Sequence, residues 1–174
     1  SRACQDFIRS SENAIQRIGE VGARHIRDGD VILTHCNSEA ALECLLTAHR
    51  KGVRFSVYAT EVRPGNQGLL TIGTLNRAGI PTTYIVDSAV RYFMKEIDRV
   101  IVGADAVSVN GAVVNKIGTS QSALAAHEAR MRTPRSARAV AQPVHLRRSA
   151  SGVYGSGEQP GLQPRGLPRR SHRS

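Results

Sequence analysis

Residues 100–105 have the sequence Val-Ile-Val-Gly-Ala-Asp, which predicts a buried strand that ends just before Asp105. A short run of β-branched residues is typical of a parallel strand covered on both faces, and the Gly-Ala pair ends it. Open α/β sheets bind their ligands at the carboxyl ends of such strands. Asp105 therefore lies where we expect the chemistry of this protein to take place.

Residues 107–119 predict a β-hairpin that leads into a helix. Val-Ser-Val and Ala-Val-Val alternate on either side of Asn110-Gly111, and this dipeptide is the strongest short-range hairpin signal. The hairpin ends at Asn115-Lys116, and Gly118-Thr119 then opens a helix. Free backbone N–H groups at a helix N-terminus and a neighbouring ammonium group both favour an anion, so this segment is a candidate phosphate site.

The part of the chain before residue 100 repeats a pattern of strand and helix. Each short apolar run ends in polar or turn residues, and helix formers follow. This spacing predicts right-handed βαβ crossovers and an α/β fold, a Rossmann-like parallel sheet with helices on both faces. No G-x-G-x-x-G follows the first strand, so the dinucleotide-binding fingerprint is absent. The expected helices are 4–27, 39–50, 67–78 and 89–95, and the expected strands are 31–34, 55–59, 82–86 and 100–102.

Cys36 lies on the turn between the first strand and the next helix. A helix N-terminus favours the thiolate, which makes a Cys there a competent base near neutral pH. An Asp held in an apolar pocket at a strand end can have a raised pKa and carry a proton. The first and fourth strands can be neighbours at the switch point of a sheet, so Cys36 and Asp105 can reach one substrate. On the residues alone, a buried structural Cys and a turn-capping Asp are the favoured interpretations.

Other polar residues at the strand ends have simpler interpretations. Asp87 and Ser88 are expected to cap the following helix. Glu61 and Arg63 form either a surface ion pair or part of the pocket wall. His35 is expected to be a packed residue beside the site rather than an acid or a base.

Residues 134–174 differ in composition from the rest of the chain. They hold five of the seven Pro and eight Arg against one acidic residue, so they carry +7 of the net charge of +10. We expect residues 1–133 to form the Rossmann-like domain and residues 134–174 to be a disordered Pro/Arg/Ser/Gly-rich tail. Because the basic charge belongs to the tail, we expect no nucleic-acid partner except through non-specific contacts of that tail.

The three Cys residues, Cys4, Cys36 and Cys44, show neither CxxC nor Cys/His spacing of the kind that zinc sites use. This pattern argues against a disulfide framework and a bound metal, and it favours a reducing compartment. No apolar run has the length of a membrane helix, and no secretory signal is recognisable. We therefore expect a cytoplasmic protein without metal or membrane.

Five ordered motifs resemble one known superfamily. That superfamily contains ribose-1,5-bisphosphate isomerase, methylthioribose-1-phosphate isomerase and the regulatory subunits of the eukaryotic translation-initiation guanine-nucleotide exchange factor. The likeness covers residues 4–133 and is strongest to the archaeal ribose-1,5-bisphosphate isomerases. The motifs are His35–Ser38, Thr60–Gly68, Tyr84–Ala89, Gly103–Asp105 and Asn110–Thr119.

This resemblance implies an aldose-ketose isomerase that converts ribose 1,5-bisphosphate to ribulose 1,5-bisphosphate in nucleotide (AMP) salvage. It implies that Cys36 is the proton acceptor and Asp105 the proton donor, with no cofactor. It also implies a phosphorylated sugar as substrate and a homo-oligomer. The substrate contacts that it implies are Ser38, Glu39, Ala40, Asn115 and Lys116.

Three other functions stay open on the sequence. A regulatory subunit of the initiation-factor type would keep the fold and the phosphate pocket, but a sensor needs no proton pair such as Cys36 and Asp105. A methylthioribose-1-phosphate isomerase would use the same pair on another substrate. A nucleic-acid binder would act through residues 134–174 and would show a steep salt dependence.

The resemblance also raises expectations about both ends of the chain. Family members carry a helical N-terminal domain, and we expect most of it to be absent from this sequence. They also continue with further strands after the last helix, and no such continuation is recognisable after Thr133. Our hypothesis is that the tail is an out-of-frame sequence, and the encoding nucleotide sequence tests it.

Overall fold

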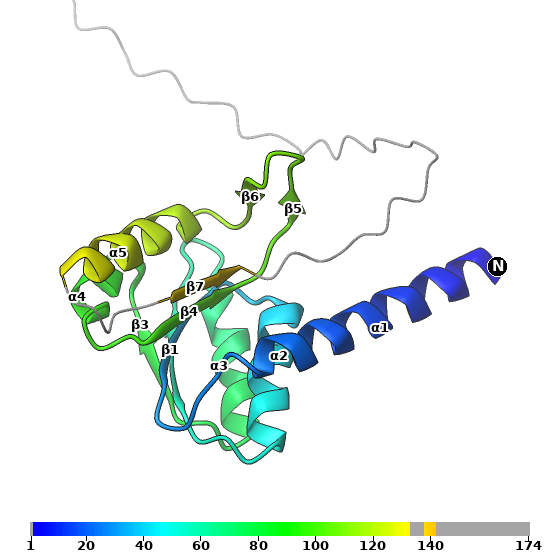
Figure 1. Cartoon of the computed structure of the whole chain (residues 1–174), viewed down its shortest axis with the longest axis horizontal. Coiled ribbons are helices and arrows are strands. Elements are labelled where there is room, and N and C mark those ends of the chain that lie inside the picture. The colour runs from blue at the N-terminus through cyan, green and yellow to red at the C-terminus, as the bar shows by residue number, and fades with distance from the viewer. Residues whose placement is uncertain (1, 133–137, 142–174) are drawn as a thin grey trace, which may run out of the picture.

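A five-stranded parallel sheet forms the centre of the fold, as the computed structural model shows for residues 2–132 and 138–141 (Figure 1). The strand order is β3-β2-β1-β4-β7, so β1 is the middle strand and pairs with both β2 and β4. The predicted parallel α/β sheet is confirmed. The strands are β1 (Val31–His35), β2 (Ser56–Thr60), β3 (Thr82–Ile85), β4 (Arg99–Val102) and β7 (Arg138–Ala141).

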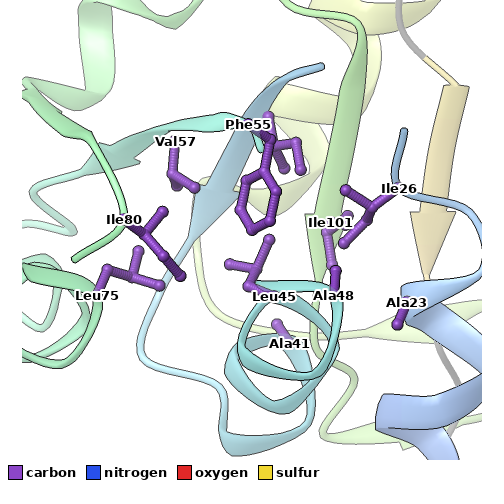
Figure 2. Close-up of a cluster of buried hydrophobic side chains, with 11 residues drawn as sticks. Ala23, Ile26, Ala41, Leu45, Ala48, Phe55, Val57, Leu75, Ile80 and Ile101 are labelled. Atoms are coloured by element: carbon purple, nitrogen blue, oxygen red, sulfur yellow. The ribbon is translucent and has the colours of Figure 1, made fainter. Parts of the chain in front are cut away.

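Helices cover both faces of the sheet, because successive strand residues point to opposite sides. Ile32 and Ile101 pack with helices α2 and α3 on one face (Figure 2), whereas Leu33 and Val100 pack with α4 and α5 on the other. These two apolar cores hold the strand ends in place. The helical elements are α1 (Arg2–Ala23), α2 (Glu39–Arg50), α3 (Gly68–Arg77), the 3-10 turn η1 (Asp87–Ala89), α4 (Val90–Phe93) and α5 (Thr119–Arg132).

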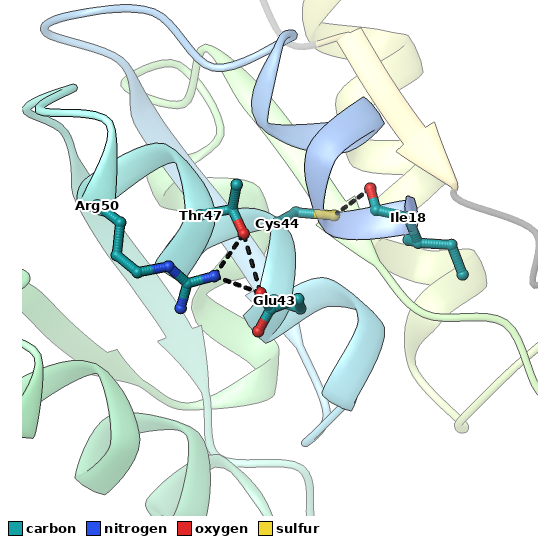
Figure 3. Close-up of polar contacts among 5 residues, drawn as sticks. All are labelled: Ile18, Glu43, Cys44, Thr47 and Arg50. Atoms are coloured by element: carbon teal, nitrogen blue, oxygen red, sulfur yellow. Dashed lines mark hydrogen bonds and ion pairs between the residues drawn. The ribbon is translucent and has the colours of Figure 1, made fainter. Parts of the chain in front are cut away.

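Helix α2 has the predicted bounds, and local chemistry explains them. The Ser38 side chain accepts a hydrogen bond from the Ala41 N–H at its start, and Lys51 ends it. On its outer surface, the Glu43 carboxylate accepts hydrogen bonds from Thr47 and Arg50 (Figure 3). This short network fixes the solvent side of the helix.

Helix α1 packs on α2 through small residues in its second half. A Cβ at Gly22 would overlap the Cys44 thiol, so only glycine allows this close approach of the two helices. The Cys44 thiol donates to the Ile18 carbonyl oxygen at 3.5 Å (Figure 3). The first half is exposed, with Phe7 at 67% and Ile8 at 54%. The expected amphipathic helix is therefore present, but the described residues cover only part of its apolar face.

The predicted hairpin is confirmed between β5 (Ala106–Val107) and β6 (Val113–Val114). The two strands are antiparallel, and Val107 is paired with Val113. Figure 1 shows the hairpin standing out from the body of the fold, and its Val residues are exposed. The segment that carries Asp105 and Lys116 therefore extends away from the packed layers.

Strand β7 differs from the prediction for the tail. Arg138–Ala141 pairs in parallel with β4, although we expected no order after Thr133. The physical reason is that the edge of β4 offers backbone N–H and C=O groups, which a short segment such as Arg-Ala-Val-Ala can satisfy although it is too short to predict as a strand. The other tail residues, 133–137 and 142–174, lie outside the described residues. No helix in the described ranges is long and apolar enough to cross a membrane.

Candidate active site at the carboxyl ends of β1 and β4

Cys36 and Asp105 follow two strands that lie side by side. His35 of β1 is paired with Val102 of β4, so Cys36 and Gly103 begin neighbouring turns at the same edge of the sheet. The turns are in close contact, because a Cβ at Gly103 would lie 2.7 Å from Cβ of Ser38. The prediction that the first and fourth strands are neighbours is thus confirmed.

The Cys36 thiol is half-buried and hydrogen-bonded. Its Sγ donates to Oε1 of Gln67 at 3.0 Å, and its backbone has a φ of 72°. Burial raises the pKa of this thiol above its ordinary value, the Asn37 N–H and the Lys116 ammonium lower it, and the Asp105 carboxylate raises it. We expected the helix N-terminus to favour the thiolate. The Asn37 N–H does favour it, but the net pKa is raised because the loss of hydration outweighs the favourable hydrogen bond and charge.

Asp105 is exposed, so the described residues do not form the apolar pocket that we expected around it. Its backbone N–H donates to the Val114 carbonyl oxygen at 2.8 Å, which fixes it at the base of the hairpin. The carboxylate acts on the Cys36 thiol through its charge, as does the Lys116 ammonium. A thiol, a carboxylate and an ammonium therefore lie within electrostatic reach of one another.

The residues that follow Cys36 form the N-terminus of α2. Ala40 packs its side chain in the core against Ile18 and Cys44, so only its backbone can face a ligand. The Glu39 side chain is exposed and lines a groove of about 470 Å³ with Asn37 and residues of α3. N–H groups in the first turn of a helix lack intrahelical acceptors and suit an anion. The expected substrate contacts of Ser38, Glu39 and Ala40 stay a prediction.

Asn115 and Lys116 lie just before α5, as predicted, with Ile117 and Gly118 between them and Thr119. The Asn115 amide donates to the Thr119 hydroxyl at 3.0 Å, and that hydroxyl donates to the Lys116 carbonyl oxygen at 2.7 Å. Both Asn115 and Lys116 are half-buried. The segment before α5 therefore carries the ammonium group whose charge acts on the Cys36 thiol.

Gln67 is the contact that sequence reasoning missed, although it is part of the Thr60–Gly68 motif. The loop that carries it contains Val62, a β-branched residue at a φ of 60°. The Asp87 carboxylate holds this strained loop by accepting hydrogen bonds from the Val62 N–H at 2.9 Å and the Arg63 N–H at 2.8 Å. The predicted helix cap at Asp87 is therefore wrong, because its side chain bonds to the neighbouring loop instead.

Three further residues, His35, Glu61 and Arg63, have the simpler roles that the sequence allowed. His35 is buried and packed, with hydrogen bonds to Thr60 and to the Ile117 carbonyl oxygen. Arg63 lies 3.7 Å from the Glu61 carboxylate with an exposed side chain, so these two form a surface ion pair worth little stability. In the described part of the chain, no group of three or more His, Cys, Asp or Glu is placed to hold a metal ion.

The fold and the site together define a class of protein. A parallel sheet that presents polar side chains and helix N-termini at the carboxyl ends of its central strands is an α/β domain of the kind in which ligands commonly bind at that edge. A family model described as the initiation factor 2 subunit family matches residues 1–135. The chain belongs to this family.

Curated relatives and solved structures agree with this assignment. A ribose 1,5-bisphosphate isomerase of Methanocaldococcus jannaschii is 60% identical over 126 residues, which are 72% of this chain and 41% of that protein. A protein of the same name from Archaeoglobus fulgidus is 55% identical over 130 residues, 75% of this chain and 42% of that protein. The chain thus spans about two fifths of the length of these relatives. The crystal structure of the Pyrococcus horikoshii translation initiation factor eIF-2B superimposes with a TM-score of 0.73 at 37% identity, covering 80% of this chain and 50% of that one.

Proposed function

We propose that this chain is part of a sugar-phosphate isomerase that converts ribose 1,5-bisphosphate to ribulose 1,5-bisphosphate. The observation that carries the proposal is the grouping of the Cys36 thiol with the charges of Lys116 and Asp105. The names of the two archaeal relatives support the same substrate. An acid, a base and an anion site at one edge of a sheet are the parts that such a reaction needs.

The chemistry assigns one role to each side chain of the proton pair. To move the carbonyl to C2, a base must remove the hydrogen on C2 while the bond from C1 to the ring oxygen breaks. A double bond then joins C1 and C2, and C1 takes up a proton as the C2 hydroxyl loses its own. In this proposal Cys36 accepts the C2 proton, and Asp105 donates a proton to the departing ring oxygen.

The two phosphates need separate holding groups, because the opened sugar would otherwise drift out of alignment. The first turn of α2, at Ser38, Glu39 and Ala40, offers backbone N–H groups to one phosphate. Asn115 and Lys116, at the start of α5, offer an amide and an ammonium to the other. Both segments lie at the edge where Cys36 is found, which supports this division.

The remaining parts of the proposal concern the setting of the enzyme. We propose a homo-oligomer, and the exposed apolar side chains of Phe7, Ile8 and the hairpin support it because such surfaces are commonly covered by a partner. We also propose that residues 1–133 are the isomerase domain and that the reaction takes place in the cytoplasm. A role in AMP salvage follows from the family resemblance.

An assay with three substrates tests the proposal. The purified chain is given ribose 1,5-bisphosphate, ribose 5-phosphate or methylthioribose 1-phosphate, and product formation and ligand binding are both measured. We expect turnover of the bisphosphate alone. Turnover of methylthioribose 1-phosphate alone would contradict the proposed substrate. Binding of the bisphosphate without turnover would instead favour a regulatory subunit of the initiation-factor type.

A further inference from the structure

The segment of residues 104–117, which carries Asp105 and Lys116, has few ties to the body of the fold. Its own hydrogen bonds are internal or lead to the start of α5, such as those of Asp105 to Val114 and of Asn115 to Thr119. Among the hydrogen bonds between described residues, one joins this segment to the central sheet. It runs from Nε2 of His35 to the carbonyl oxygen of Ile117 at 2.7 Å.

The hydrogen-bond partners of His35 determine where its protons lie. A carbonyl oxygen only accepts, so Nε2 must carry a hydrogen and donate it to Ile117. The other ring nitrogen, Nδ1, lies 2.7 Å from the Thr60 hydroxyl, which donates to it when the ring is neutral. His35 is only 2% exposed, so water does not compete for either bond. The ring is thus held at both ends, between β2 and the segment that precedes α5.

Gly118 also packs closely against the His35 ring. A Cβ at this position would lie 2.7 Å from Cε1 and 2.8 Å from Nε2 of the His35 ring, and the backbone has a φ of +99°. Only glycine combines that conformation with such close contact. The backbone at Ile117 and Gly118 therefore packs directly against the imidazole ring of His35.

We propose that His35 is a positioning residue that fixes the Lys116 ammonium beside the Cys36 thiol by holding the Ile117–Gly118 backbone. His35 directly precedes Cys36 on β1, and Ile117 directly follows Lys116, so one hydrogen bond sets the relative position of the two functional side chains. The inference rests on the proposed function where it concerns turnover. It can be tested on the thiol alone, without any activity.

The experiment compares two substitutions that remove different bonds of the ring. In His35→Asn the shorter amide can still contact Thr60 but does not reach Ile117. In His35→Gln the longer amide can donate to Ile117 in place of Nε2. Thr60→Val removes the hydroxyl on the other side of the ring with little change in volume, so it is the matched control.

The measurement is the pKa of the Cys36 thiol, obtained from the rate of reaction with iodoacetamide as a function of pH. All variants carry Cys4→Ser, and burial raises the pKa of Cys44 to about 11, so that thiol reacts little. Lys116 and Asp105 are the charged groups that act on the Cys36 thiol. Each variant is measured with Lys116 and with Lys116→Met, because the difference isolates the contribution of that one ammonium.

We expect Lys116→Met to raise the thiol pKa in the parent, His35→Gln and Thr60→Val proteins and to change it little in His35→Asn. We also expect kcat to fall about ten- to hundredfold in His35→Asn with partial rescue in His35→Gln, the size of loss that a small misplacement causes. An undiminished response to Lys116→Met in His35→Asn overturns the inference, whatever the activity. If Lys116→Met no longer shifts the thiol pKa in His35→Asn and the chain has no isomerase activity, the positioning role is still supported. The missing activity then counts only against the proposed function.

Gly118→Ala provides a second variant if His35→Asn does not fold, as judged by circular dichroism. It leaves the imidazole intact and pushes the backbone off the ring. We expect it to lose the response to Lys116→Met as His35→Asn does. If Lys116→Met still shifts the thiol pKa in Gly118→Ala, packing of this segment against His35 does not position Lys116.

Discussion

The Cys36 thiol, directly after β1, donates a hydrogen bond to Oε1 of Gln67, the N-cap residue of α3, at 3.0 Å. The acceptor keeps the hydrogen on sulfur, and burial of the thiol favours the same neutral form. The proposed base is therefore held in its protonated state in the free protein. This relationship makes the pH dependence of the site a direct test of its geometry.

Alkylation of Cys36 by iodoacetamide should be slow at neutral pH and should accelerate above the pH at which an ordinary thiol ionises. The sign follows from the pKa, because a raised pKa leaves less thiolate at a given pH, and the thiolate is the reacting form. The proposed isomerase rate, measured as kcat/KM, should rise with pH in parallel. A thiol that reacts fully at pH 6 would contradict the buried, hydrogen-bonded state.

Lys116→Met and Asp105→Asn should shift the pKa of Cys36 in opposite directions. Removing the ammonium removes a charge that favours the thiolate, so the pKa rises, and removing the carboxylate lowers it. Reaction rates with iodoacetamide across a pH series measure both shifts. Equal pKa values in the two variants would show that these charges do not act on the thiol.

Cys36→Ser should abolish turnover of ribose 1,5-bisphosphate while leaving binding of that ligand within a fewfold of the parent. The hydroxyl replaces the thiol with little change in volume but is a much weaker base at neutral pH. Cys4→Ser, on the exposed part of α1, is the matched control and should keep its activity. Near-normal turnover by Cys36→Ser would reject the proton-acceptor role.

Asp87→Ala should destabilise the protein by about 1–3 kcal/mol, because the Val62 and Arg63 N–H groups lose a charged acceptor. Asp87→Asn retains one oxygen and should cost less. Urea unfolding followed by circular dichroism measures both changes. If Asp87 were only a cap of the following helix, the two variants would leave the alkylation of Cys36 unchanged; we expect it to change because the same loop carries Gln67.

Gly22→Ala should destabilise the fold by about 1–3 kcal/mol, since its methyl group would overlap the Cys44 thiol at the contact of α1 and α2. Gly73→Ala is the matched control within a helix. A Cβ there would meet only the guanidinium of Arg77 at 3.5 Å, so we expect a neutral effect or a gain of up to about 1 kcal/mol. Thermal unfolding of both variants measures the difference, and a tolerated Gly22→Ala would show that the two helices are less closely packed.

Much of the fold could be predicted because its signals are local. The helix formers of residues 39–50, the turn at Asn110-Gly111 and the β-branched run before Asp105 are each local signals, and the structure has α2, the hairpin and β4 at those places. The neighbouring position of β1 and β4, the strands that precede Cys36 and Asp105, then followed from the rules of parallel sheets.

The rest depends on contacts between residues that are distant in the sequence. Gln67 reaches Cys36 only because Asp87, twenty residues further along the chain, holds the intervening loop in a strained conformation. Strand β7 exists only through its pairing with β4. The pKa of Cys36 likewise depends on its burial and on the distant charges of Asp105 and Lys116, which the local helix start does not reveal.

The place of β1 in the middle of the sheet has a consequence for how the protein tolerates partial unfolding. Strands β3 and β7 at the edges can fray without exposing the backbone of β1, which is protected from both sides. Amide protons of β1 should therefore be among the slowest to exchange with deuterated solvent. The position of the Cys36 thiol, directly after β1, would therefore be kept during local unfolding and lost only when the whole domain unfolds.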